Sequence, residues 1–385
     1  MPNSNPLVSV IIPAYNATAF ICDTLDSVIA QTYPRVEIIV VNDGSQDETA
    51  KIVQSYCDRV SFIRLIQQEN AGVAAARNRA IEAAQGEYIA PIDADDVWLP
   101  QKLEKQVECF VRSPGSVGLV YSWSVDVDEQ NEVTGGFCAW KVNGDAYIPM
   151  IYTNFLGNAS SPLIRRECFE QVGGYNTELR ALNAQGCEDW DLYLRIAERY
   201  QVRVIPELLV RYRQSANSMS TNPEMMRRSF ELTMQDVQQR HPEIPAKMFH
   251  WATSHYYCGL AERSLGRGES QQAIAYLLKA VQLDYLPYFY PGRYRLFLIS
   301  LLHWFRQFWT AKDPTQLAAE ADQSWTLSLE DIYRKIDRKR QGFLGEQRTR
   351  LLEWKWQRMA QLINSSRNID LNKKGDRFKR SPFET

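Results

Sequence analysis

Carboxylates closely follow short apolar, β-branched runs in the first quarter of the chain. One such run is followed by Asp43, and another by the segment 93–96, which reads Asp-Ala-Asp-Asp. Mg²⁺ and Mn²⁺ prefer oxygen ligands and are commonly held by one or two carboxylates together with substrate phosphates. The pair Asp93 and Asp95 therefore indicates a divalent-cation site, although the same spacing is also found in solvated loops that cap helices.

Histidine chemistry is excluded from the same half of the chain. The four histidines are His241, His250, His255 and His303, so none lies in the first 240 residues. A site there cannot use Ser-His-Asp or Cys-His catalysis, and carboxylates must act as the bases. No GxGxxG or GxxxxGK[ST] loop is present, which disfavours dinucleotide dehydrogenases and P-loop enzymes.

The elements that would carry these residues follow from hydrophobic periodicity. Four strands and three intervening helices are predicted over the first 92 residues: strands 7–13, 36–41, 60–66 and 88–92, and helices 17–31, 45–56 and 72–84. Successive strand–helix units predict an open, mostly parallel α/β sheet with right-handed crossovers. Ligands bind beyond the carboxyl ends of strands in such sheets, which is where the acidic residues fall.

Composition indicates a globular protein of two or three domains. The 385 residues are 45% hydrophobic and 23% charged, close to the soluble average. The seven cysteines are scattered without CxxC spacing, which favours reduced thiols. We expect a catalytic domain at 1–222, a helical region at 223–330 and a basic, helical to disordered tail at 331–385. The helical region includes a hairpin that is either one tetratricopeptide-like unit or an ordinary helical pair.

The tail is basic while the body is acidic. Residues 331–385 contain 15 Lys and Arg against 7 Asp and Glu, within a chain of net charge −2. No nucleic-acid-binding motif accompanies this charge, so we expect no nucleic acid partner. A solvated helical face, docking on the acidic body and attraction to anionic lipid remain open. Residues 296–309, with polar residues confined to a stripe through Ser300 and His303, are either an interfacial membrane helix or a core-packing helix.

Five motifs in order carry a family resemblance. They are VSVIIPAYN at 8–16, VVNDGS at 40–45, NAGVAAARN at 70–78, IDADD at 92–96 and EDWDL at 188–192. Together they resemble the inverting glycosyltransferases of family 2, which have the Rossmann-like GT-A fold of nucleotide-diphospho-sugar transferases. The resemblance covers about residues 7–220 and implies a GT-A catalytic domain followed by an all-α region.

The resemblance also implies roles for individual residues. Asp95 would bind Mg²⁺ or Mn²⁺, and a further group would bind the nucleotide-sugar donor: Pro13, Tyr15, Asn16, Asp43, Arg77 and Asp93. Asp189 would be the general base that takes the acceptor's proton, a choice that spacing alone would not make over its neighbours. Glu188 would be a diphosphate or acceptor contact.

One departure from the family pattern concerns the segment after the last predicted strand. Many relatives read tyrosine-arginine-x-histidine there, whereas here Tyr212-Arg213-Gln214 precedes Ser215. Arg211, Arg213 and Ser215 are therefore predicted diphosphate or acceptor contacts, and the strength of metal binding is open.

The sequence thus predicts transfer of a sugar, most simply from a UDP-linked donor, to a hydroxyl of a glycan or lipid-linked acceptor. Bacterial cell-surface polysaccharide or glycolipid synthesis is the setting expected by analogy. The location would be cytoplasmic, with peripheral membrane contact through residues 290–385. The alternatives are a sugar nucleotidyltransferase and a non-catalytic helical interaction protein.

Overall fold

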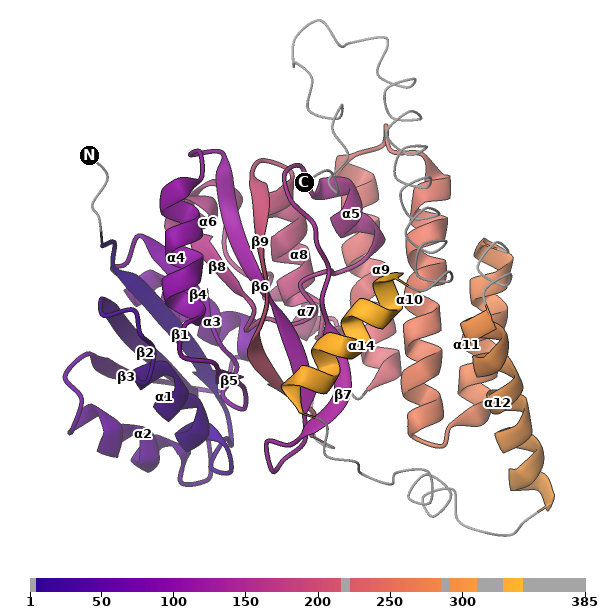
Figure 1. Cartoon of the computed structure of the whole chain (residues 1–385), viewed down its shortest axis with the longest axis horizontal. Helices are drawn as coiled ribbons and strands as arrows, with labels where there is room; N and C mark the ends of the chain where they lie inside the picture. Colours follow the sequence, from indigo (N-terminus) through magenta and orange to yellow (C-terminus); the bar gives the residue numbers. More distant parts are fainter. Residues whose placement is uncertain (1–4, 216–221, 285–290, 310–327, 342–385) are drawn as a thin grey trace, which may run out of the picture.

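A computed structural model describes residues 5–215, 222–284, 291–309 and 328–341. Its first half is a parallel sheet in the order β3-β2-β1-β4 (Figure 1). The strands are β1 (Val8–Ala14), β2 (Val36–Asp43), β3 (Ile63–Gln68) and β4 (Tyr88–Pro91). Helices α1 (Ile21–Ile29), α2 (Thr49–Cys57) and α3 (Val73–Ala83) connect them. The predicted alternation is confirmed.

Alternate residues of β1 lie on the two faces of this sheet. Val10 and Ile12 belong to a core cluster with Leu25 of α1, while Ile11 lies in a second cluster with Ala76 of α3. Both faces are therefore buried, as expected for a parallel sheet. Helix α2 begins later than predicted, at Thr49 rather than residue 45.

The second half of the sheet is mixed rather than parallel. Strand β8 (Pro162–Arg165) runs antiparallel to β4 and to β6 (Val117–Val127), and β6 runs parallel to β9 (Gln201–Arg213). Two short strands complete the described sheet: β5 (Val97–Trp98) on β9 and β7 (Val133–Cys138) on β6. Because β4 is followed directly by the acidic loop and β5, without a crossover helix, the chain re-enters the sheet with opposite direction.

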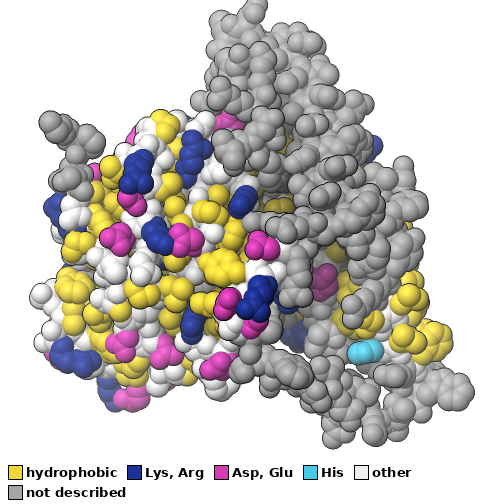
Figure 2. Space-filling view, viewed as in Figure 1, with side chains coloured by type: hydrophobic (Ala, Val, Ile, Leu, Met, Phe, Trp, Pro, Cys, Tyr) yellow, Lys and Arg dark blue, Asp and Glu magenta, His cyan; other side chains and the backbone are white. Residues whose placement is uncertain are grey.

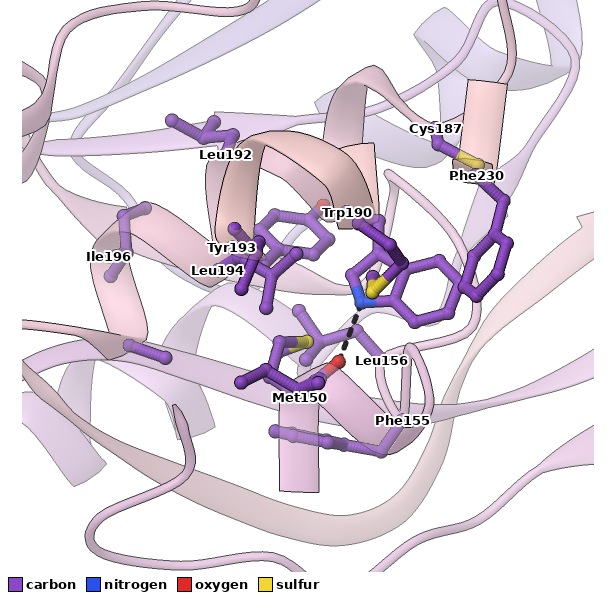
Figure 3. Packing of buried hydrophobic residues seen from close by; sticks show 14 of the residues in the cluster. Met150, Phe155, Leu156, Cys187, Trp190, Leu192, Tyr193, Leu194, Ile196 and Phe230 are labelled. Carbon is purple, nitrogen blue, oxygen red and sulfur yellow. Dashed lines mark hydrogen bonds between the residues drawn. The ribbon is translucent and has the colours of Figure 1, made fainter. Parts of the chain in front are cut away.

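Five further helices cover this half: α4 (Lys102–Arg112), α5 (Tyr147–Tyr152), α6 (Arg166–Val172), α7 (Glu178–Ala181) and α8 (Glu188–Ala197). Helix α8 packs on the interior through Trp190, whose indole Nε1 donates to the carbonyl oxygen of Met150 at 2.7 Å (Figure 3). The same indole lies 5.3 Å from the ring of Phe230. The amino end of α8 is thereby fixed.

The C-terminal region is helical, as expected. Its described helices are α9 (Pro223–Arg240), α10 (Ala246–Gly266), α11 (Ser270–Leu283), α12 (Pro291–Trp309) and α14 (Leu329–Gln341). Tyr256 of α10 stacks on Phe230 of α9 at 4.0 Å and lies 5.7 Å from Trp190 of α8. One continuous apolar core therefore joins the helical region to the α/β half.

Helix α14 returns to the sheet. Ile332 and Ile336 are buried in a cluster with Trp123 and Leu208, and Lys335 Nζ donates to the carbonyl of Gly135 at 2.7 Å. Figure 1 shows α14 lying across the strands near β7. The first part of the segment 331–385 thus packs on the predicted catalytic half, and its remainder from 342 lies outside the described residues.

The visible face of the sheet region carries charges of both signs among hydrophobic side chains. Figure 2 shows Lys, Arg, Asp and Glu side chains intermixed over it. Among the described helices, none combines the length and apolarity needed to cross a bilayer.

Candidate active site

Hydrogen bonds to Ser160 fix the acidic loop after β4. The backbone N–H of Asp93 donates to Ser160 Oγ at 2.9 Å, and that hydroxyl donates in turn to the carboxylate of Asp96. Trp98 Nε1 donates to the carbonyl of Ser160 at 2.9 Å. Asp96 is fully buried, and its burial next to Asp95 raises its pKa well above the usual range. Asp96 therefore orients the loop and does not face the site.

Arg213, the last residue of β9, ties this loop to its surroundings. Its backbone N–H donates to Asp96 Oδ1 at 2.9 Å, and its Nε donates to the carbonyl of Asp95 at 2.7 Å. Its other nitrogens donate to the carbonyl of Glu129 at 2.7 Å and to the carboxylate of Asp23 at 3.0 Å. The buried guanidinium thus donates its hydrogen bonds to protein acceptors. Its contact with a diphosphate remains a prediction.

Asp95 has the features of a cation ligand. Its side chain is partly exposed, and burial together with the neighbouring Asp93 raises its pKa to about 6. A bound cation would relieve that repulsion. Within the described residues, no cluster of three or more His, Cys, Asp or Glu side chains is placed to hold a metal ion. A cation at Asp95 would therefore need phosphate or water oxygens as further ligands, which fits Mg²⁺ or Mn²⁺ with a nucleoside diphosphate.

Arg77 is the cation beside this loop. It is 4% exposed on α3, forms an ion pair with Asp93 and lies with its guanidinium 5.1 Å from the centre of the Tyr175 ring. Its Nε is buried and has no hydrogen-bond partner in the described structure. This donor has no protein partner, and the contact of Arg77 with a nucleotide base remains a prediction.

Asp43, at the end of β2, holds the loop that begins α3. Its carboxylate accepts from Gln68 Nε2 at 2.7 Å and from the backbone N–H groups of Ala71 and Gly72, each at 2.8 Å. Gly72 has φ +92°, a left-handed conformation that favours glycine. Asp43 therefore helps to place α3 and Arg77, and its predicted contact with a uracil-like base remains a prediction.

The end of β1 joins the end of β2. Asn16, at φ +48°, donates its backbone N–H to Ser45 Oγ at 3.0 Å and accepts from the N–H of Gln46 at 2.9 Å. Pro13 is buried in β1, whereas Tyr15 is 51% exposed. A large aromatic ring left in solvent beside the strand ends is available to stack on a flat ligand.

The three acids at the start of α8 have different environments. Glu188 is buried and accepts the N–H of Gly186 at 2.7 Å, and Asp191 is buried in an ion pair with Arg195 at 2.6 Å. Asp189 is partly exposed and has no ion pair in the described structure. Of the three, its carboxylate is the one available to a substrate.

The Asp189 carboxylate is held in place by neutral donors. It accepts from the N–H of Trp190 at 2.7 Å and from Asn154 Nδ2 at 3.3 Å. Burial raises its pKa to about 6, partly offset by the positive charge of Arg77. Burial of this kind is how enzymes tune carboxylates for proton transfer near neutral pH.

The structure brings Asp189, Arg77 and Asp93 into one electrostatic neighbourhood, because Arg77 and Asp93 both influence the pKa of Asp189. Two tyrosines at this place were not found from the sequence. The hydroxyls of Tyr175 and Tyr193 are buried without a hydrogen-bond partner in the described structure. Burial raises the pKa of both groups, and the nearby charges of Asp189 and Asp93 raise it further. Their spacing gave no signal, because Tyr175 lies far from the motifs.

Two other predicted contacts lie at the edge of this neighbourhood. Arg211 donates to the carbonyl of Asn131 at 3.3 Å and keeps a buried, unpartnered Nε in the described structure. Ser215 is partly buried and is the last described residue before the segment 216–221. Both roles remain predictions.

Comparison with known proteins assigns the family. The protein-family model described as "Glycosyl transferase family 2" matches residues 9–173 of this chain. The uncharacterized glycosyltransferase RP339 of Rickettsia prowazekii is 30% identical over 225 residues, 57% of this chain and 67% of the relative. The putative teichuronic acid biosynthesis glycosyltransferase TuaG of Bacillus subtilis is 50% identical over 111 residues, 28% of this chain and 43% of its own length. The chain also covers 34% of a Rickettsia felis relative.

Solved structures share the fold. The crystal structure of S. aureus TarS aligns with a TM-score of 0.52 and 19% identity, covering 72% of this chain and 49% of that one. TarS 1–349 in complex with UDP aligns with a TM-score of 0.51 and 18% identity, covering 77% of this chain and 88% of that one. The fold and the acidic loop at its strand ends define a GT-A-type protein. The chain belongs to glycosyl transferase family 2.

Proposed function

We propose that this protein is an inverting glycosyltransferase that moves a sugar from a nucleoside-diphosphate donor, UDP-linked, to a hydroxyl acceptor. The observation that carries the proposal is the partly exposed Asp189 beside the Arg77–Asp93 pair. In the reaction the acceptor oxygen attacks the anomeric carbon, Asp189 takes the hydroxyl proton, and the bond to the diphosphate breaks. Attack from the face opposite the leaving group inverts the anomeric configuration.

The remaining predicted residues would bind the nucleotide-sugar donor. Tyr15 would stack on the base and Asp43 would accept its N–H, while Asp93 would bind ribose. Mg²⁺ or Mn²⁺ at Asp95 would neutralise the charge that develops on the departing diphosphate. TarS 1–349 was crystallised in complex with UDP, which supports a uridine donor for a protein of the same fold.

The setting we propose is bacterial surface glycan synthesis at the inner face of the membrane. TuaG is described as a putative teichuronic acid biosynthesis glycosyltransferase, which supports a glycan or lipid-linked acceptor. In the sequence, Ser300 belongs to the narrow polar stripe of α12, and an interfacial helix would turn that stripe toward water. Ser300 is instead buried, while Leu298, Leu302 and Phe305 are 56%, 60% and 55% exposed.

This exposed stripe, Leu298–Leu302–Phe305, has the i, i+4, i+7 spacing of one helix face. The sequence 291–309 contains three arginines and no Asp or Glu. Apolar residues in water next to cationic residues are typical of a helix that binds an anionic lipid surface. We therefore assign the stripe to peripheral membrane contact.

The alternatives have less support. A sugar nucleotidyltransferase needs a glycine-rich basic loop after β1, which Ala14-Tyr15-Asn16-Ala17 does not supply. A purely helical interaction protein would not need the available carboxylate of Asp189.

Asp189→Asn tests the proposal because it keeps the side-chain volume and removes the base. We expect transfer to fall about 10²–10⁴-fold, while UDP with Mn²⁺ still raises the melting temperature. Asp58→Asn, an exposed acid immediately after α2, is the matched control. A screen of nucleotide sugars would be followed by NMR of the product's anomeric configuration. Full activity of Asp189→Asn, or a retained configuration, would contradict the proposal.

A further inference from the structure

Two charged side chains are not explained by the sugar-donor site. They are Asp126 on β6, which is partly buried, and Arg263 on α10, which is exposed. Within the described part of the chain, neither the Asp126 carboxylate nor the Arg263 guanidinium forms an ion pair or a side-chain hydrogen bond. A carboxylate withdrawn from water is usually paired. Because neither group has such a partner here, both are available to a ligand.

Asp126 is held rigidly at the end of β6. Its register partner is Tyr212 of β9, one residue before Arg213, which fixes the acidic loop. Its carboxylate lies against the backbone of Gly136, where an added Cβ would be only 2.1 Å from Oδ2. Only glycine leaves room at that place on β7. The carboxylate is therefore positioned at the same sheet edge as the proposed metal loop.

Arg263 is placed by the packing of α10 on α9. Tyr256 stacks on Phe230, and its hydroxyl donates to the carbonyl of Met226 at 3.0 Å. Arg263 lies seven residues further along, on the same face of the helix. Its charge reaches both Tyr256 and Asp126, and the charge of Asp189 also reaches Tyr256. Tyr256 also lies 5.7 Å from Trp190, the residue that follows Asp189. The middle of α10 therefore borders the side of the site where Asp189 would meet an acceptor.

We propose that Asp126 and Arg263 bind the hydroxyl groups of a neutral saccharide acceptor, an inference that rests on the proposed glycosyltransferase function. The carboxylate can accept hydrogen bonds from two hydroxyls, and the guanidinium can donate to a ring or hydroxyl oxygen. A neutral acceptor fits better than a phosphorylated one. Among the described residues of this neighbourhood, the carboxylates of Asp126, Glu188 and Asp189 outnumber the available cation of Arg263, while the charge of Arg77 is already paired with Asp93.

The test measures saccharide binding directly. Saturation-transfer NMR on the full chain with UDP and Mn²⁺ would use methyl glycosides of glucose, galactose and mannose as probes, with glycerol phosphate as the anionic comparison. We expect the glycosides to bind and glycerol phosphate to bind less. Asp126→Asn and Arg263→Gln should each weaken glycoside binding about tenfold or more, with a change in UDP affinity below about twofold. Arg267→Gln, whose guanidinium is engaged by Glu269, is the matched control.

Each outcome bears on one proposal. Undiminished glycoside binding in both variants, equal loss in Arg267→Gln, or preferred binding of glycerol phosphate would overturn the acceptor assignment while leaving UDP binding intact. Glycosides that do not bind the unmodified protein would overturn it as well. Failure of UDP to bind with Mn²⁺ would instead count against the proposed function. Circular dichroism melting of Asp126→Asn, which is isosteric, separates loss of binding from loss of folding.

Discussion

At the scale of single residues, neighbouring acids with the same chemistry have different tasks because their surroundings differ. Glu188 caps its own turn and Asp191 is paired with Arg195, so Asp189 alone of the three presents an available carboxylate. In the acidic loop, Asp96 is bonded to Ser160 and Arg213, which leaves Asp95 toward the ligand side. The environment, and not the residue type, separates these roles.

The raised pKa of Asp189 predicts the direction of the pH dependence of transfer. A carboxyl group with a pKa of about 6 keeps its proton below that pH and can act as a base only above it. With saturating Mn²⁺, we expect kcat/KM to rise with pH through about 6 and to be about tenfold lower at pH 5 than at pH 7.5. The pH profile of initial rates measures this.

The Asp189→Asn variant separates titration of the base from inactivation of the whole protein at low pH. In Asp189→Asn the residual rate should lose the limb near pH 6, because the group that titrates there is gone. A profile of unchanged shape in that variant would assign the limb to another group.

At the scale of elements, α12 is a helix whose apolar stripe faces outward. A helix packed solely within a protein would bury such a face and expose Ser300. In α12 the arrangement is the opposite, with the Ser300 hydroxyl bonded to the carbonyl of Leu296 at 2.8 Å and the apolar stripe exposed. The proposed membrane contact would cover this stripe.

We therefore expect a triple substitution of Leu298, Leu302 and Phe305 to serine to lower flotation with vesicles containing phosphatidylglycerol. The loss should be about tenfold or more, because the exposed apolar area provides the binding energy. The matched control replaces three exposed apolar residues elsewhere, Phe62, Val111 and Leu182, by serine. Equal flotation of the two triple variants would count against a specific role of α12.

At the scale of the whole molecule, the helical region is continuous with the α/β half. The Trp190–Phe230–Tyr256 contacts join α8, α9 and α10, so the helix that carries Asp189 is supported by the helices behind it. Helix α14 closes the other side by covering Trp123 and Leu208. Removal of everything after residue 290 would expose this cluster, so membrane binding is better tested by point substitution.

The docking of α14 predicts a local stability effect. Ile332→Ala removes a fully buried side chain and should weaken docking by about 2–5 kcal/mol. Amide hydrogen exchange within α14 should then accelerate about 30-fold or more. Asp337→Ala, on the exposed side of the same helix, is the control and should leave exchange nearly unchanged. Equal exchange in the two variants would mean that α14 is not held by this cluster.

The sequence by itself determined the α/β alternation, the helical C-terminal region and the placement of Asp43, Asp93 and Asp95 at strand ends. These features depend on local periodicity and on turn residues, which act over a few neighbouring positions. The ordered motifs added the family and singled out Asp189.

Only the tertiary structure decided which polar groups are occupied and which remain available. Arg213 is bonded to Asp23, 190 residues away, and Arg263 influences the pKa of Asp126 from another region of the chain. The inward turn of Ser300 and the return of α14 to the sheet likewise depend on packing between distant segments. Local patterns cannot specify such partners, because burial and pairing are chosen when remote elements meet.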